Sequence, residues 1–219
     1  MSPQLFGHPF SSYTMKALIA LYENETPFDF RMLGADHPEN AAELARRWPV
    51  GRFPILVDGT TTVVETSAII EHLEVFHAGP VPLIPADAKQ AVQVRMLDRV
   101  FDGHVMAPMQ AIVSDARRPE DARDRYGVSQ ARTSLDAIYG WLDHALAGRR
   151  WAAGEAFTLA DAAAAPALFY ADWVQPIGES HATLKAYRGR LLARPSFARC
   201  IEDARPYRRF FPPGAPDRD

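Results

Sequence analysis

Two pairs of adjacent polar residues stand where predicted helices begin, and their chemistry suits a small charged ligand. Glu65-Thr66 follows a predicted strand and precedes a helical run, and Ser11-Ser12 precedes another. A carboxylate and a hydroxyl beside the N–H groups of a helix start can bind both charges of an amino-acid head group. Because the same residue types are also ordinary helix caps, the elements around them must decide between a binding site and a cap.

The stretch 51–74 predicts a β-hairpin followed by a helix. Strands are expected at 53–57 and 62–64, and an Asp-Gly pair between two β-branched runs is a strong hairpin signal. Pro54 enters the first strand at a point where its missing N–H is harmless. The helix that follows has one apolar face, made of Ala68, Ile69, Ile70 and Leu73.

The rest of the N-terminal pattern completes a small α/β domain. Further strands are predicted at 4–7 and 28–33, with helices up to about residue 24 and at 41–48. A strand, a helix and a strand within about 30 residues form a βαβ unit, whose strands are parallel. Residues 1–78 therefore have the element order of a thioredoxin-like domain.

The remaining chain has a different character. Residues 79–87 are rich in Pro and Gly and are expected to be a linker. After them, helical periodicity predicts helices at 86–116, 128–145, 182–193 and 196–204. Another helix is expected after Thr158, which forms a capping box with Asp161. The predicted fold class is thus an α/β thioredoxin-like N-terminal domain followed by an all-α domain at 88–219.

The hairpin and helix resemble the glutathione-binding half of the cytosolic glutathione transferase superfamily, whose pattern is Gly-x-x-Pro, strand, Asp-Gly, strand, Glu-Ser-x-Ala-Ile. The capping box is a second point of resemblance, and together they cover about residues 4–205. The resemblance implies a cis peptide before Pro54 and backbone contacts from Phe53 to the cysteinyl part of glutathione. It also implies that Glu65 and Thr66 hold the γ-glutamyl end. Thr66 stands where the family usually has serine, and threonine also has the hydroxyl group needed for this contact.

The resemblance also implies a catalytic hydroxyl in the loop before the first helix, as in serine-type, bacterial-like members. Counting back from the following helix places this hydroxyl on Ser11, with Ser12 as the alternative and simple capping as a third reading. A free thiol titrates near ~8.5, so lowering that value by about 2 units requires roughly 3 kcal/mol of anion stabilisation. A charge-assisted hydrogen bond supplies roughly 1.5–3 kcal/mol and a helix N-terminus ~0.5–2 kcal/mol. Tyr13 is expected to pack.

Other residues are candidates for the remainder of the site. Arg52 either reaches the glycine carboxylate of glutathione or is a solvated surface charge. Candidates for the wall of an electrophile pocket, unless they belong to the core, are Phe10, Phe101, His104, Met106, Tyr170 and Trp173. No metal is expected, because the seven histidines are scattered and no i, i+4 pair is joined to a carboxylate.

Composition narrows the function classes. The net charge of -3 gives no indication of the basic surface that binds nucleic acid. No apolar run approaches the roughly 20 residues of a membrane span. One cysteine and the lack of a signal-peptide pattern suit a reducing cytoplasm.

The expected function is a detoxifying glutathione S-transferase that conjugates glutathione to small apolar electrophiles, and the resemblance implies a homodimer. Two alternatives remain open. One is another glutathione-dependent enzyme on the same fold, such as an isomerase, a peroxidase or a disulfide reductase. The other is a non-catalytic interaction module. Two departures from the family pattern, Thr66 and a tryptophan at 48 where the family often has Asn, keep that second alternative in view.

Overall fold

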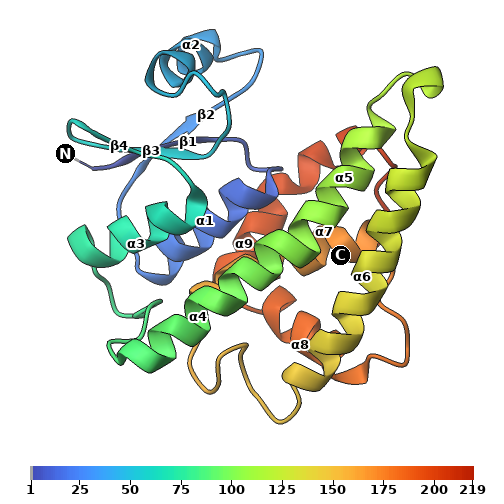
Figure 1. Ribbon diagram of the computed structural model, residues 1–219. Coiled ribbons are helices and arrows are strands. Elements are labelled where there is room, and N and C mark those ends of the chain that lie inside the picture. The colour runs from blue at the N-terminus through green and yellow to red at the C-terminus, as the bar shows by residue number, and fades with distance from the viewer. Residues whose placement is uncertain (1) are drawn as a thin grey trace.

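A mixed β-sheet lies at the centre of the N-terminal part of the computed structural model, which describes residues 2–219 (Figure 1). In these residues the sheet has the strand order β2-β1-β3-β4. Its strands are β1 (Gln4–Gly7), β2 (Asp29–Met32), β3 (Ile55–Asp58) and β4 (Thr61–Val63). β1 pairs in parallel with β2 and antiparallel with β3, and β3 pairs antiparallel with β4. The parallel pair and the hairpin were both predicted, and the thioredoxin-like order is confirmed.

The helices of this part connect and cover the sheet. They are α1 (Ser12–Glu23), α2 (Pro38–Arg47) and α3 (Thr66–Phe76). α2 begins three residues earlier than predicted, because proline suits the first turn of a helix. β3 begins at Ile55 rather than at residue 53, and the cis Phe53-Pro54 peptide directly precedes it.

Helices make up the C-terminal part, as predicted. They are α4 (Ala88–Val100), η1 (Phe101–Met106), α5 (Ala107–Ala116), η2 (Glu120–Ala122), α6 (Arg125–Ala145), α7 (Leu159–Val174), α8 (Ala182–Leu192), α9 (Pro195–Ala204) and η3 (Arg205–Phe210). Within residues 2–219 no helix combines the length and the apolar character needed to span a membrane.

The predicted helix at 86–116 is present, but its winding changes in the middle. Between α4 and α5 the six residues of η1 form a π-helix. Pro108 follows directly, and proline has no N–H to donate to the carbonyl four residues earlier. The regular α-helical hydrogen-bond pattern is therefore interrupted just before Pro108. In proteins generally, π-helical turns often occur near functional sites.

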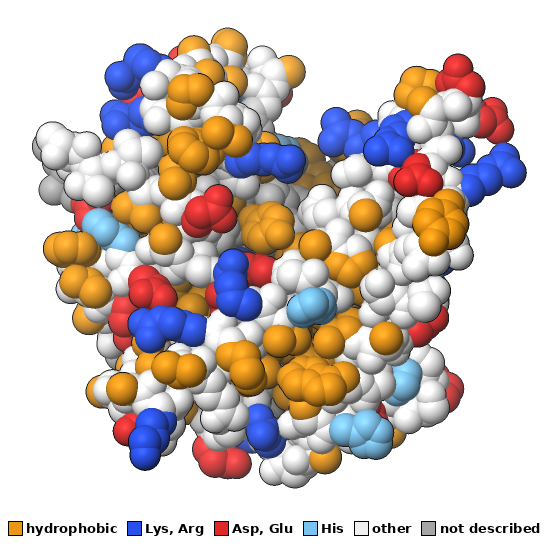
Figure 2. All heavy atoms as spheres, in the orientation of Figure 1, with side chains coloured by type: hydrophobic (Ala, Val, Ile, Leu, Met, Phe, Trp, Pro, Cys, Tyr) orange, Lys and Arg blue, Asp and Glu red, His pale blue; other side chains and the backbone are white. Residues whose placement is uncertain are grey.

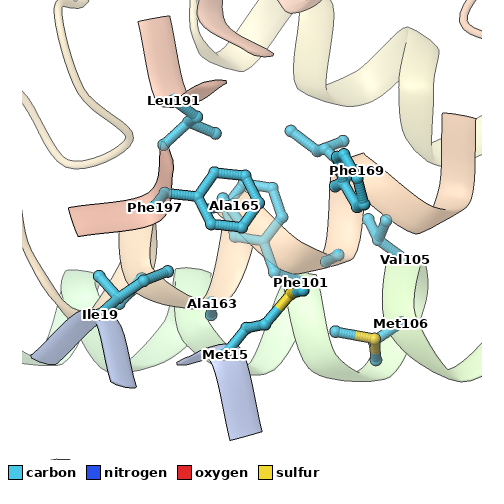
Figure 3. Packing of buried hydrophobic residues seen from close by; sticks show 14 of the residues in the cluster. Met15, Ile19, Phe101, Val105, Met106, Ala163, Ala165, Phe169, Leu191 and Phe197 are labelled. Carbon is cyan, nitrogen blue, oxygen red and sulfur yellow. The ribbon is translucent and has the colours of Figure 1, made fainter. Parts of the chain in front are cut away.

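α7 forms the centre of the helical core and joins it to the N-terminal part. The predicted capping box is present, with the Thr158 amide donating to Asp161 Oδ2 at 2.9 Å. Every residue of α7 is buried, and its alanines allow close approach of neighbouring helices. Figure 3 shows Met15 and Ile19 of α1 beside Ala163 of α7, with Phe101 close by. The two parts of the chain thus share one continuous apolar core.

Candidate functional site

A cavity of about 1290 Å³ opens between the N-terminal part and α5. Figure 2 shows the surface hollowed between α2 and the tip formed by α5 and α6, with basic side chains on both sides. The predicted site residues that line the cavity are Phe10, Ser11, Ser12, Arg52, Phe53, Pro54, Glu65, Thr66 and Tyr170. The fold therefore brings together four segments that are up to 160 residues apart in the sequence.

The two serines differ in their surroundings. Ser11 is the N-cap of α1, and its Oγ accepts a hydrogen bond from the Thr14 amide at 3.3 Å. Ser12 is buried, and its Oγ accepts from Gln110 Nε2 at 3.2 Å. A hydroxyl that accepts in this way keeps its own proton to donate. Ser11, the more exposed of the two, can thus cap the helix and donate to a ligand at the same time.

Tyr13 also lines the cavity, although the sequence favoured a packing role for it. Burial, and then the nearby carboxylate of Asp102, raise the pKa of Tyr13 to about 12. The phenol is therefore protonated at neutral pH and can donate a hydrogen bond, but it cannot act as a base. Tyr13 is the second residue of α1, whereas Ser11 is the N-cap at the helix start itself.

The Phe53-Pro54 segment also lines the cavity. The peptide bond is cis, as the resemblance implied. Phe53 is 38% exposed beside the cavity, so a ligand lying there can reach the main chain of this residue. Arg52, also exposed, lies next to it and provides a positive charge at the rim.

Glu65 has an unusual backbone conformation. Its φ is +66°, in a region that non-glycine residues seldom occupy. Such conformations cost on the order of 1–3 kcal/mol and cluster at binding sites. Within the described residues the Glu65 side chain forms no cap hydrogen bond to α3, so its carboxylate is not engaged in the capping role that its position first suggested. Thr66 begins α3 and places the first amides of that helix at the cavity.

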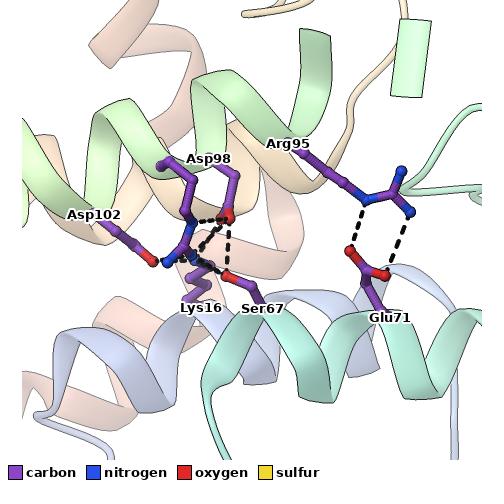
Figure 4. Close-up of polar contacts among 7 residues, drawn as sticks. Lys16, Ser67, Glu71, Arg95, Asp98 and Asp102 are labelled. Carbon is purple, nitrogen blue, oxygen red and sulfur yellow. Dashed lines mark hydrogen bonds and ion pairs between the residues drawn. The ribbon is translucent and has the colours of Figure 1, made fainter. Parts of the chain in front are cut away.

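A buried charge cluster beneath Thr66 was missed by the sequence analysis (Figure 4). Lys16 of α1 is fully buried, and its Nζ lies 2.5 Å from Asp98 Oδ1, 2.7 Å from Asp102 Oδ2 and 3.0 Å from Ser67 Oγ. Arg99 contacts the same carboxylates from the exposed side. Two aspartates four residues apart share one helix face, and that spacing was the available signal.

Asp102 connects this cluster to the cavity that it lines. Burial raises the pKa of its carboxyl group, and Lys16 partly opposes the shift. Asp102 Oδ1 is buried and has no hydrogen-bond partner among the described residues. The cluster thus presents a carboxylate next to the helix start of Glu65 and Thr66.

Four predicted pocket residues lie elsewhere. Phe101 and Met106 are fully buried in the core, because η1 turns that face toward α7. Trp173 packs with Phe211, at a ring distance of 5.1 Å, and does not line the cavity. His104 lines a separate cavity of about 390 Å³. These four residues therefore do not line the cavity, contrary to the prediction from the sequence.

The wall is instead formed by aromatic residues and one face of α5. Phe10 and Tyr170 remain in it, and the Tyr170 hydroxyl donates to the Phe10 carbonyl at 3.0 Å. Gln110, Ser114 and Arg117 also line the cavity. Their spacing of four and three residues places them on one helical face. The sequence analysis expected an apolar wall, whereas the observed one combines aromatic rings with polar groups.

Comparison with known proteins identifies the family. Residues 5–80 match the family model described as glutathione S-transferase, N-terminal domain. Residues 100–195 match the one described as glutathione S-transferase, C-terminal domain. The chain belongs to the cytosolic glutathione S-transferase superfamily, as its fold and hairpin motif indicated.

Individual relatives are distant but cover most of the chain. Glutathione S-transferase GstB of Escherichia coli K12 is 26% identical over 168 residues, which are 75% of this chain and 81% of that protein. FtsZ-localized protein A of Caulobacter vibrioides is 28% identical over 212 residues, which are 92% of each. The crystal structure of a glutathione S-transferase from Methylobacterium radiotolerans in complex with glutathione sulfonate has a TM-score of 0.78 and 28% identity, and covers 92% of this chain and 95% of that chain.

Proposed function

We propose that this protein is a serine-type glutathione S-transferase, similar to bacterial members, that joins the thiolate of glutathione to small electrophiles. One observation carries the proposal: Ser11, the Phe53-Pro54 peptide and the Glu65-Thr66 pair line the same cavity. The related structure with bound glutathione sulfonate supports glutathione as the co-substrate.

In this proposal each charged end of glutathione has a partner. The carboxylate of Glu65 binds the γ-glutamyl ammonium group, and the Thr66 hydroxyl with the first amides of α3 binds the neighbouring carboxylate. Arg52 pairs with the glycine carboxylate at the opposite end. The backbone of Phe53 holds the cysteinyl part between them. The thiol is thereby placed near the start of α1.

Ser11 then stabilises the sulfur as an anion. The thiol proton passes to solvent, and the Ser11 hydroxyl donates a hydrogen bond to the thiolate. The sulfur attacks the electrophilic carbon and a carbon–sulfur bond forms. With an aryl halide the halide leaves with the bonding electrons. With an enal the electron pair moves toward the carbonyl oxygen, and a proton from water completes the addition.

The electrophile is proposed to lie between the aromatic residues and α5. Phe10 and Tyr170 provide flat apolar contacts, while Gln110 and Arg117 can contact a polar or negatively charged substituent. Activated aryl halides, enals and isothiocyanates fit this description. A detoxifying role in the cytoplasm is part of this proposal.

A homodimer is also proposed, on the basis of apolar side chains at the surface of two adjacent helices. Phe76 of α3 is 67% exposed, and Val92 and Met96 of α4 are 67% and 51% exposed. Arg95 and Glu71 join α4 to α3 at 2.8 Å (Figure 4), so these side chains lie on neighbouring elements. A second copy would remove them from water.

Product analysis tests the proposed reaction. The purified protein is incubated with glutathione and, in separate reactions, an aryl halide, an enal, an isothiocyanate, a hydroperoxide, a disulfide and a cis-enone. We expect glutathione adducts of the first three, detected by mass, at rates well above the protein-free control. Reduction of the hydroperoxide or disulfide, or isomerisation of the enone, without any adduct would contradict conjugation and favour another glutathione enzyme.

The second candidate function is a non-catalytic interaction module. The observation that favours it is the similarity, over 92% of the chain, to a protein named for its localisation with FtsZ. A module of this kind has no need of a glutathione site. Absence of both glutathione binding and every reaction of the panel would therefore favour it over the transferase.

A further inference from the structure

Three potential metal ligands meet at the end of the sheet that is remote from the cavity. Asp58 ends β3, His72 lies in α3, and His77 is the residue that caps the C-terminus of α3. Asp58 Oδ2 is 2.9 Å from His72 Nε2 and 2.7 Å from His77 Nε2. The three side chains are 20%, 12% and 25% exposed, so the cluster is partly buried but open to small solutes.

This convergence is unusual for a simple cap. Both imidazole rings direct the same ring nitrogen at one carboxylate oxygen, and the three ligand atoms all lie within 4.8 Å of one another. Ligand atoms around a tetrahedral zinc ion, at about 2.0–2.2 Å from the metal, are about 3.3 Å apart. An opening of roughly half an ångström would therefore turn the two hydrogen bonds into metal–ligand bonds.

We propose that Asp58, His72 and His77 form a binding site for a divalent transition-metal cation, with zinc as the representative ion. Two imidazoles and one carboxylate suit zinc, copper, nickel or cobalt, whereas magnesium and calcium prefer all-oxygen sites. In the bound form each ring carries its hydrogen on Nδ1 and binds the ion through the lone pair of Nε2, and water completes the coordination. The negative end of the α3 dipole lies at the same place, because the His77 amide donates to the Leu73 carbonyl at 2.8 Å.

The position of the cluster gives the ion a structural role. α3 runs from Thr66 to Phe76 and is about 16 Å long, with the proposed glutathione site at its N-terminus and His77 at its C-terminus. β3 likewise has Pro54 near one end and Asp58 at the other. Figure 1 shows the β3–β4 hairpin beside α3. A bound ion would fasten that hairpin to the helix without touching the reaction, so the inference does not rest on the proposed function.

This site differs from the sequence prediction of no metal, which was based on the absence of histidines four residues apart beside a carboxylate. His72 and His77 are five apart, and the second lies just beyond the helix, where the chain can turn its ring back. The carboxylate comes from a strand 14 residues earlier. Only the three-dimensional fold brings these groups together.

Metal binding is measured on the full chain after treatment with a chelator. Calorimetric titration with zinc chloride should give one ion per chain, and zinc at a hundredfold excess over its dissociation constant should raise the midpoint of thermal unfolding by about 5–10 °C. Asp58→Asn and His77→Gln should each weaken zinc binding at least tenfold. The matched control is His37→Gln, at an exposed histidine of the same domain, which should bind zinc as the wild type does.

Two further measurements use the wild-type protein, so they do not depend on whether a variant folds. Cobalt bound to the wild type should give the visible absorption bands of a four-coordinate ion with nitrogen ligands, and magnesium or calcium should not displace it. The affinity for glutathione sulfonate, which lacks a metal-binding thiol, should be the same with and without zinc. Zinc binding weaker than millimolar, or equal binding by wild type, Asp58→Asn and His77→Gln, would overturn the proposal.

Discussion

Replacing Ser11 by alanine should lower the turnover of glutathione conjugation by about 10- to 150-fold, with a change of less than about twofold in the affinity for glutathione. The Ser11 hydroxyl is placed to donate to the sulfur, and this bond is strongest when the sulfur carries its charge. Loss of a charge-assisted hydrogen bond of roughly 1.5–3 kcal/mol corresponds to that range of rates. The pKa of the bound thiol, followed by thiolate absorbance, should rise in the variant.

Ser12→Ala is the matched control, since the neighbouring serine differs mainly in its contacts. Ser12 is buried and accepts from Gln110, so its loss should leave the thiol pKa unchanged. A loss of activity in Ser12→Ala but not in Ser11→Ala would transfer the role to Ser12. Full activity in both variants would show that neither serine stabilises the thiolate.

Replacing Lys16 by methionine should lower the free energy of unfolding by about 3–5 kcal/mol. The substitution retains the apolar length of the side chain but removes its charge. Among the described residues, the Lys16 ammonium group is the only buried cation within 3 Å of Asp98 and Asp102. Two carboxylates would then be left in the interior with only the exposed Arg99 beside them. Denaturant titration of the wild type and the variant gives the difference directly.

Arg95→Met provides the control for this measurement. Arg95 of α4 pairs with Glu71 of α3, two of the helices that the buried cluster joins, but these side chains are 46% and 42% exposed. Exposed pairs of this kind contribute ~0.2–1 kcal/mol. If Lys16→Met were no more destabilising than Arg95→Met, the buried cluster would not hold α1, α3 and α4 together in the way described.

The N-terminal fold was predictable because its signals are local. An Asp-Gly pair between two β-branched runs specifies a hairpin through turn geometry alone, and a cis bond at Pro54 was implied by the family pattern in register with it. Glu65 and Thr66 could be placed at the start of a helix for the same reason. The capping box at Thr158 likewise depends on residues three apart.

The wall of the cavity and the charge cluster depend on contacts between distant elements. Periodicity showed that Phe101 and Met106 lie on a helix, but the turn of η1 that directs them into the core cannot be inferred from spacing. A lysine within the apolar repeat of α1 gave no indication of its partners, which lie more than 80 residues away. Such pairings are properties of tertiary packing rather than of local pattern.

The central claim is that this chain binds glutathione through the Glu65-Thr66 helix start, and calorimetric titration with reduced glutathione tests it most directly. We expect one site per chain in the wild type and at least tenfold weaker binding in Glu65→Ala, because a charge-assisted bond of roughly 1.5–3 kcal/mol is lost. No heat of binding and no thermal stabilisation of the wild type at several millimolar glutathione would contradict the account.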